Sequence, residues 1–114
     1  IALENDRYWM AADVLSLSSG PIVKALEYAS GKTAMVMGKP SPAFFNLALQ
    51  DMHLPPEQVV MIGDDIDTDI GGAYHVGMKT ILVRTGKYRS ESVESAMIKP
   101  TGIIDSISFI HDLI

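Results

Sequence analysis

The chain has 114 residues and a mass of 12.4 kDa, which is the size of one small domain. Hydrophobic residues make up 47% and charged residues 20%, values typical of globular proteins that argue against disorder and against a simple coiled coil. The net charge of −5 argues against a protein that wraps nucleic acid, and no apolar run approaches the roughly 18 residues of a membrane helix. Because there is no cysteine, a disulfide framework and thiolate metal sites are excluded, and we expect a cytoplasmic protein.

Short apolar runs and helical patterns alternate along the first half of the chain. Residues 1–17 are typical of a strand end followed by a loop. Serine and proline at 18–21 predict the start of a helix that runs to the stop signal Gly31. The apolar run 34–37 predicts a short buried strand, and a second helix is expected to begin at 41–42. The inward face of that second helix should consist of Phe44, Phe45, Leu47, Ala48 and Met52.

The second half carries the stronger signals. The continuous apolar run 59–62 predicts a parallel strand covered on both faces, and residues 80–83 predict another. A helix ending near His75 should lie between them, and residues 91–99 should form a loop with a helical turn. A last strand at 102–105 should precede a terminal amphipathic helix with Ile107, Ile110 and Leu113 on its apolar side. This order predicts an α/β fold, with a parallel Rossmann-like sheet and flanking helices.

Four aspartates follow the predicted 59–62 strand within six residues: Asp64, Asp65, Asp67 and Asp69. Ligands of open α/β sheets bind beyond the carboxyl ends of the strands, so chemistry is expected at this turn. Crowded carboxylates repel one another unless a cation neutralises them, and oxygen ligands without His or Cys indicate Mg²⁺. Helix capping is the structural alternative, with Asp67 as N-cap and Asp69 near the positive helix end. Capping leaves Asp64 and Asp65 unexplained.

Lys39 is the second candidate functional residue. It follows Gly38 after the predicted 34–37 strand and precedes the next helix. An ammonium group at such a junction can contact a phosphate as a compact point charge, although a solvated loop lysine is the ordinary alternative. Because the acidic turn follows one βαβ unit later, we expect Lys39 and the aspartates at the same edge of the sheet. Phosphoryl transfer requires such an arrangement of charges.

Three motifs in this order and spacing resemble one known family. They are Gly38-Lys39-Pro40-Ser41-Pro42, then Val59-Val60-Met61-Ile62-Gly63-Asp64-Asp65 with Thr68-Asp69-Ile70, then Val83-Arg84-Thr85-Gly86-Lys87-Tyr88. The pattern resembles the haloacid dehalogenase (HAD) superfamily of phosphatases, in the branch with a large α/β cap. The resemblance implies a Mg²⁺-dependent phosphohydrolase that acts on a small phosphorylated substrate through an aspartyl-phosphate intermediate.

The resemblance also implies a role for each candidate residue. Lys39 matches the family lysine that steadies the nucleophile and the transferring phosphoryl group, so it would serve both catalysis and substrate binding. Asp64 matches the metal-binding acid. Asp65 and Asp69 match supporting acids that orient metal waters or the lysine, so we expect Asp65 at the metal with Asp64, and Asp69 in catalysis with Lys39. Asp67 matches no required position.

The family's nucleophilic Asp-x-Asp-Gly-Thr motif has no counterpart upstream of Lys39, where Asp6 and Asp13 each stand alone. We therefore expect the C-terminal part of a phosphatase. Residues 1–37 would be the end of the cap and its return to the core, and residues 38–114 the second half of the core. Such an incomplete sheet lacks its first strand and exposes a hydrophobic edge, which a complementary N-terminal segment or self-association should cover. The chain alone should be inactive.

Two other classes of protein share parts of this pattern. A truncated, non-catalytic α/β module that binds a divalent metal or a partner could carry the same acidic turn. A receiver-type phosphorylation domain also combines acids with a lysine, but there the acids precede the lysine, and the order here is reversed. Neither nucleic acid nor a membrane is expected as a partner.

Overall fold

The structure of the chain is a computed structural model that describes residues 1–112. Leu113, which the sequence pattern assigns to the terminal helix, lies outside the described residues. The elements in chain order are β1 (Tyr8–Ala11), β2 (Val14–Leu17), α1 (Ser19–Ser30), α2 (Pro42–Met52), β3 (Val60–Gly63), a π-helical turn (Ile66–Gly71) continuing into α3 (Gly72–His75), β4 (Lys79–Val83), α4 (Ser90–Ser95) and β5 (Gly102–Ile104). Short 3-10 helices lie at Pro56–Gln58 and Ile107–Asp112.

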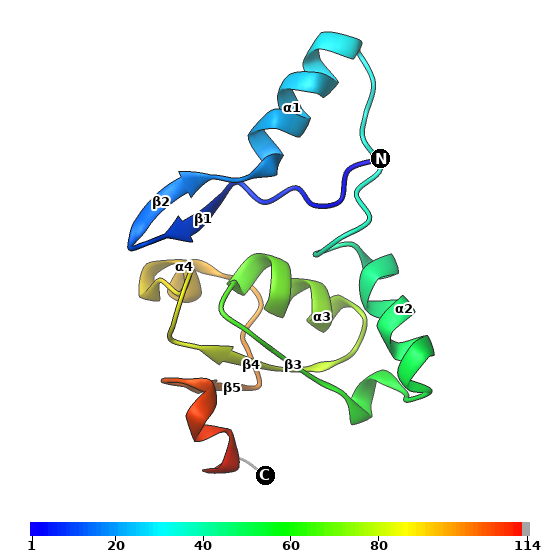
Figure 1. Ribbon diagram of the computed structural model, residues 1–114. Coiled ribbons are helices and arrows are strands. Elements are labelled where there is room, and N and C mark those ends of the chain that lie inside the picture. The colour runs from blue at the N-terminus through cyan, green and yellow to red at the C-terminus, as the bar shows by residue number, and fades with distance from the viewer. Residues whose placement is uncertain (113–114) are drawn as a thin grey trace.

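The core is a parallel three-stranded sheet in the order β3-β4-β5, which confirms the predicted α/β class (Figure 1). One face of this sheet is covered by two apolar clusters. The first joins Phe45 and Leu49 of α2 to Ala73 and Met78, and the second joins Ile66, Ile70, Leu82 and Val93. The π-helical turn and α3 therefore lie directly on the sheet, and they fix the position of the acidic turn that precedes them.

The opposite face of the sheet is much less covered. A groove of about 450 Å³ runs across it, lined mainly by apolar side chains of β3 and β4 and by the first residue of β5. The lining residues are Val60, Ile62, Lys79, Ile81, Thr101, Gly102 and Ile110. Within the described residues β3 is also the outer strand on its side of the sheet, because it pairs with β4 alone. The run 59–62, which the sequence predicts to be covered on both faces, is thus covered on one face.

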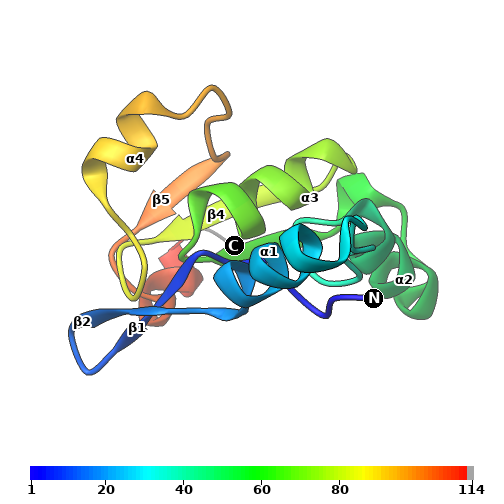
Figure 2. The same ribbon diagram turned by 90° about the horizontal axis from the view of Figure 1, so that it is seen from above.

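Residues 1–37 form a separate layer above the core (Figure 1). Strands β1 and β2 make an antiparallel hairpin that projects outward, and α1 follows it (Figure 2). Two predictions were wrong here. Within the stretch 1–17, residues 8–17 form a hairpin in place of the expected loop, because Ala12 and Asp13 adopt positive φ and reverse the chain. The expected buried strand 34–37 is a single bridge between Ala2 and Val36, and the methionines on either side of Val36 are exposed.

The predicted inward face of α2 is only partly correct. Phe45 is 2% exposed and packs in the first cluster, but Phe44 is 44% exposed, and Leu47 and Met52 also face outward. Leu49, which the prediction omitted, is buried instead. A helix that lies on one side of a small core buries a single stripe, so apolar residues off that stripe remain exposed.

Within residues 1–112, no helix has the length and hydropathy to span a bilayer.

Candidate active site

The turn after β3 folds back on its own last aspartate. Asp69 is 3% exposed, and its Oδ2 accepts hydrogen bonds from the backbone N–H groups of Asp64 (3.2 Å) and Asp65 (3.3 Å). The π-helical turn brings Asp69 back to the tip of the strand that it follows by six residues. The aspartates predicted as a group therefore share one hydrogen-bonded turn at the carboxyl edge of the sheet.

Lys39 reaches this turn from the segment before α2. Its Nζ lies 2.5 Å from Oδ1 of Asp69, while the other oxygen of Asp69 is held by the turn itself. The side chain of Lys39 is 39% exposed, so it pairs with the buried Asp69 while part of it remains in contact with solvent. Lys39 and the acidic turn thus lie at the same edge of the sheet, linked through Asp69.

Asp65 caps the helix that follows it. Its Oδ1 accepts the N–H groups of Asp67 (3.0 Å) and Thr68 (3.1 Å), which corrects the expectation that Asp67 is the N-cap. Its Oδ2 lies 3.1 Å from Nζ of Lys87. Burial alone would raise the pKa of Asp65, but the hydrogen bond from Thr68 and the ion pair with Lys87 outweigh it and lower the pKa below the ordinary value. Asp65 is therefore ionised at neutral pH.

The loop after β4 closes over Asp64. Oδ2 of Asp64 accepts the backbone N–H of Lys87 at 2.7 Å. This approach requires glycine at position 86, where φ is +55° and a Cβ atom would lie 2.0 Å from the same oxygen. Oδ1 of Asp64 accepts no hydrogen bond from the described part of the chain. One carboxylate oxygen is thus fixed by the loop, and the other is free for a ligand.

Lys87 connects the acidic turn with the N-terminal layer. Its Nζ lies 2.6 Å from Oδ2 of Asp6 as well as 3.1 Å from Asp65, and it sits 5.8 Å from the centre of the Tyr8 ring. Burial alone would lower the pKa of Lys87, but its bonds to Asp6 and Asp65 raise the pKa well above the ordinary value. The ammonium group is thus shared by two carboxylates that come from different layers.

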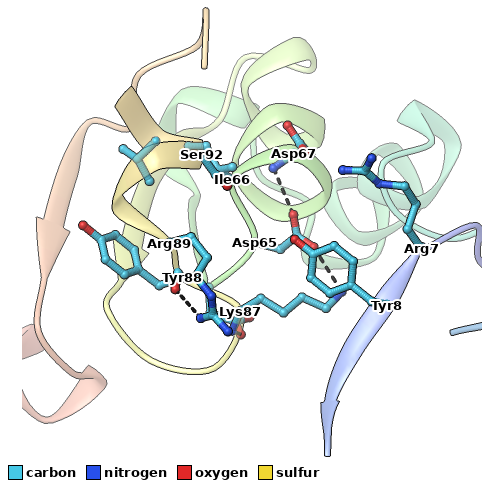
Figure 3. Close-up of a pocket in the computed structure, with 11 residues that line it drawn as sticks. Arg7, Tyr8, Asp65, Ile66, Asp67, Lys87, Tyr88, Arg89 and Ser92 are labelled. Carbon is cyan, nitrogen blue, oxygen red and sulfur yellow. Dashed lines mark hydrogen bonds and ion pairs between the residues drawn. The ribbon is translucent and has the colours of Figure 1, made fainter. Parts of the chain in front are cut away.

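Two hollows adjoin these residues. The smaller, of about 40 Å³, lies beside Asp64, Asp65 and Lys87 and has room for a few water molecules (Figure 3). The larger, of about 230 Å³, opens between the acidic turn and the N-terminal layer. Tyr8 lines both hollows. Thr68 lines the larger one, and its Oγ1 is a buried side-chain oxygen without a hydrogen-bond partner in the described chain.

Comparison with known families decides what this arrangement belongs to. Residues 36–109, more than half of the chain, match the model of the HAD-hydrolase-like family. The chain belongs to this family. The motifs around Lys39 and Asp64 lie within the matched region, so the comparison confirms the resemblance that they suggest.

Relatives with names cover the whole chain but extend well beyond it. Human (Homo sapiens) phospholysine phosphohistidine inorganic pyrophosphate phosphatase is 46% identical over 114 residues, which are 100% of this chain and 42% of that protein. Human haloacid dehalogenase-like hydrolase domain-containing protein 2 is 48% identical over 111 residues, 97% of this chain and again 42% of the relative. The chain therefore spans less than half the length of these members of the HAD-hydrolase-like family.

Solved structures of phosphatases share the fold. The p-nitrophenyl phosphatase from Archaeoglobus fulgidus has a TM-score of 0.83 and 30% identity, covering 96% of this chain and 44% of that one. The glycerol phosphate phosphatase from Mycobacterium tuberculosis, solved in complex with magnesium, has a TM-score of 0.76 and 30% identity, covering 89% of this chain and 31% of that one. The arrangement of elements in this HAD-hydrolase-like chain thus matches part of the fold of these two phosphatases.

The oxygen donors at the turn can be tested against the needs of Mg²⁺, which takes one or two carboxylates and completes its coordination with water or phosphate oxygens. Among residues 1–112, no three His, Cys, Asp or Glu side chains converge on a common point. Asp64 suits such an ion, because its Oδ1 is free. Asp65 has both oxygens engaged by the cap and by Lys87. The donor set therefore fits a Mg²⁺ bound through Asp64, with further ligands from elsewhere.

Neither Lys87 nor Asp6 is predicted as a site residue from the sequence. A signal existed for Lys87, because it belongs to the loop that leaves β4 at the same sheet edge as the acidic turn. No comparable signal existed for Asp6, since it is 81 residues from Lys87 in the chain and sits before a hairpin whose orientation the sequence does not specify.

Proposed function

We propose that this chain supplies the phosphate lysine and the metal-binding acid of a Mg²⁺-dependent HAD-type phosphatase that acts on a small phosphorylated substrate. The observation that carries the proposal is the connection of Lys39, Asp69 and Asp64 in one hydrogen-bonded unit at the carboxyl edge of a parallel sheet. A fixed cation beside carboxylates at a sheet edge is what electrostatic stabilisation of a phosphoryl group requires. The family membership and the names of the relatives support the same class.

Each residue then has a specific task. Lys39 binds the phosphoryl oxygens through the exposed side of its ammonium group, and Asp69 holds Lys39 in place from the buried side. Asp64 holds the metal through its free oxygen. Asp65 supports the metal site indirectly, because its carboxylate fixes the start of the helix and pairs with Lys87. When bound, Mg²⁺ supplies charge neutralisation for the phosphate, as expected from the magnesium complex of the mycobacterial relative.

The nucleophile of an aspartyl-phosphate mechanism must come from outside these 114 residues. Upstream of Lys39 the sequence offers Asp6 and Asp13 alone. Asp6 is held in the ion pair with Lys87, and Asp13 lies exposed at the hairpin turn. We therefore assign residues 1–37 to the end of a cap and residues 38–114 to half of a core, which a complementary N-terminal segment completes.

The outer edge of β3 and the uncovered sheet face are where this segment would bind. The backbone of Val60–Gly63 pairs with β4 on one side within the described residues, and the groove beside it is apolar. Exposed apolar edges of this kind recruit further strands. In the absence of a complementary segment, two copies of the chain would associate through this surface. A well-behaved monomer in size-exclusion chromatography would contradict this part of the proposal.

The metal assignment is tested on the chain itself by titration calorimetry with Mg²⁺. We expect Asp64→Asn to abolish binding and Asp67→Asn to retain it, because Asp67 is exposed and its side chain has no assigned role. Equal effects of the two substitutions would refute the assignment of Asp64.

The catalytic assignment is tested with p-nitrophenyl phosphate. The chain alone should not hydrolyse it, whereas the chain joined to the segment encoded upstream should do so in the presence of Mg²⁺. In that active form Lys39→Ala should abolish turnover, and Lys32→Ala, at an exposed position remote from the turn, should not. Appreciable turnover by the 114 residues alone would refute the external nucleophile.

The uncovered sheet face favours a second candidate, a non-catalytic α/β module that binds a partner. Its apolar groove of about 450 Å³ is larger than either hollow at the acidic turn. The upstream coding sequence discriminates between the two candidates, because the phosphatase requires an Asp-x-Asp motif there and the module does not.

A further inference from the structure

The N-terminal layer, residues 1–37, continues into the core at Gly38, which packs closely on the backbone of Leu3, and its side-chain hydrogen bonds to the core lie at a second place. Among the described residues, the side-chain hydrogen bonds between this layer and the core run from Lys87 to Asp6 and from Arg89 to the sulfur of Met10. The larger hollow lies between the layer and the core beside these hydrogen bonds. Apart from the chain connection at residues 37–38, residues 87 and 89 therefore hold the layer over the acidic turn.

We propose that Lys87 is a positioning residue, a latch that ties Asp6 of the N-terminal layer to Asp65 of the acidic turn and so sets the opening between them. The side chains of Lys87, Asp6 and Asp65 are each only 16–17% exposed. An ion pair shielded from water to this degree is stronger than a surface pair, and removing one member leaves the other charges buried without compensation.

The backbone of Lys87 also binds the acidic turn, and this bond fixes the position of the latch relative to Asp64. The N–H of Lys87 donates to Asp64 at 2.7 Å, and Gly86 lets the loop approach closely enough for that bond. A displacement of the loop would therefore move the latch and the candidate metal acid together. Figure 3 shows the side chain of Lys87 extending from this loop past Asp65 toward Tyr8.

The larger hollow is lined by residues of both the N-terminal layer and the acidic turn, and this connects the latch with the proposed function. Asp6, Arg7 and Tyr8 contribute from the layer, and Asp65 and Thr68 contribute from the turn. If the proposed function holds, this opening is where a phosphorylated substrate passes between cap and core. Lys87 is proposed to set the position of the N-terminal layer, however, and this position can be measured without catalysis.

The experiment uses the absence of cysteine from the chain. Spin labels are attached at two exposed positions, through Val14→Cys in the hairpin and Glu91→Cys on α4. Pulsed electron–electron double resonance measures the distance between the two labels. We expect a narrow distance distribution in the otherwise unchanged chain, and a broad one after Lys87→Met or Asp6→Asn. Lys87→Arg should restore the narrow distribution, because a guanidinium can bind both carboxylates.

The matched control is Arg84→Met, which breaks the exposed pair of Arg84 with Asp105 away from the junction and should leave the distribution narrow. Circular dichroism verifies that each variant is folded, and Asp6→Asn provides a latch variant that leaves the acidic turn untouched. Unchanged distributions in both Lys87→Met and Asp6→Asn would overturn the latch, as would a broad distribution in Lys87→Arg. Absence of Mg²⁺ binding by the unsubstituted chain, or of phosphatase activity in its completed form, would overturn the proposed function and leave the distance result standing.

Discussion

The close approach of the 86–87 loop to Asp64 gives a prediction with a worked magnitude. Gly86→Ala places a methyl group on a residue with φ of +55° and puts its Cβ 2.0 Å from Oδ2 of Asp64. The left-handed backbone costs an L-residue about 1–2 kcal/mol. Asp64 must also turn away and give up the hydrogen bond from the Lys87 N–H, which costs about 1–3 kcal/mol for a charged acceptor. We expect a loss of about 2–5 kcal/mol in the free energy of unfolding.

The matched control is Gly77→Ala in the same core. Gly77 has φ of +88°, but its nearest neighbour to a Cβ is the side chain of Pro56 at 3.6 Å, an ordinary contact. This substitution should cost only the backbone term of about 1–2 kcal/mol. Urea unfolding followed by circular dichroism measures both values. If Gly86→Ala costs no more than Gly77→Ala, the loop does not fix Asp64 in the way the structure indicates.

The same variant separates stability from ligand binding. Because Asp64 loses the group that orients it, the proposed affinity for Mg²⁺ should fall by about 10- to 100-fold in Gly86→Ala, the usual effect of removing a supporting contact from a metal ligand. Gly77→Ala should bind Mg²⁺ like the unchanged chain. Titration calorimetry on the folded variants checks this difference.

Three further predictions concern stability. Phe45→Ala should cost about 3–5 kcal/mol in urea unfolding, because Phe45 is buried in the first apolar cluster, while Phe44→Ala at its half-exposed neighbour should cost far less. Asp69→Asn should lower the free energy of unfolding by about 1–3 kcal/mol, because it weakens the bonds to Lys39 and to the turn. Asp105→Asn, in an exposed ion pair, should lower it by less than about 1 kcal/mol. The pKa of Asp65 is lowered in the folded chain. Its ionised carboxylate therefore stabilises the fold at pH values above the ordinary carboxyl pKa, and this stabilisation is lost as pH falls through the lowered pKa. Unfolding measured between about pH 5 and pH 2 should therefore show less pH dependence in Asp65→Asn.

The core half of the fold could be predicted because its signals are local. The apolar runs that became β3 and β4, the acidic turn between them and the lysine before α2 each follow from a few neighbouring residues and from the rule that parallel strands end at a common edge. Topology then brings Lys39 to Asp69 although 30 residues separate them. No specific contact had to be known for that expectation.

The N-terminal layer could not be predicted in the same way. The hairpin at 8–17 depends on positive φ at Ala12 and Asp13, and alanine does not mark such a turn, so that Asp13 alone is a weaker signal than the usual Asn-Gly or Asp-Gly pair. The helix cap was predicted at Asp67 but lies at Asp65, and this error has a different cause. The helix begins at Ile66, two residues earlier than an N-cap at Asp67 implies, and a cap shifts with the first helical residue.

The exposure of β3 conflicts with its own sequence, and the conflict has a physical meaning. A continuous apolar run is typical of a strand covered on both faces, yet Met61 packs inward on the first cluster while Val60 lines an open groove and is 43% exposed. Leaving such side chains in water forfeits burial energy on every alternate residue of the strand. The acidic turn at its tip, in contrast, satisfies its carboxylates with Lys39, Lys87 and backbone N–H groups. The site therefore has local partners, whereas the sheet beneath it leaves apolar side chains in water, and that asymmetry supports our proposal that a complementary segment carrying the nucleophile covers β3.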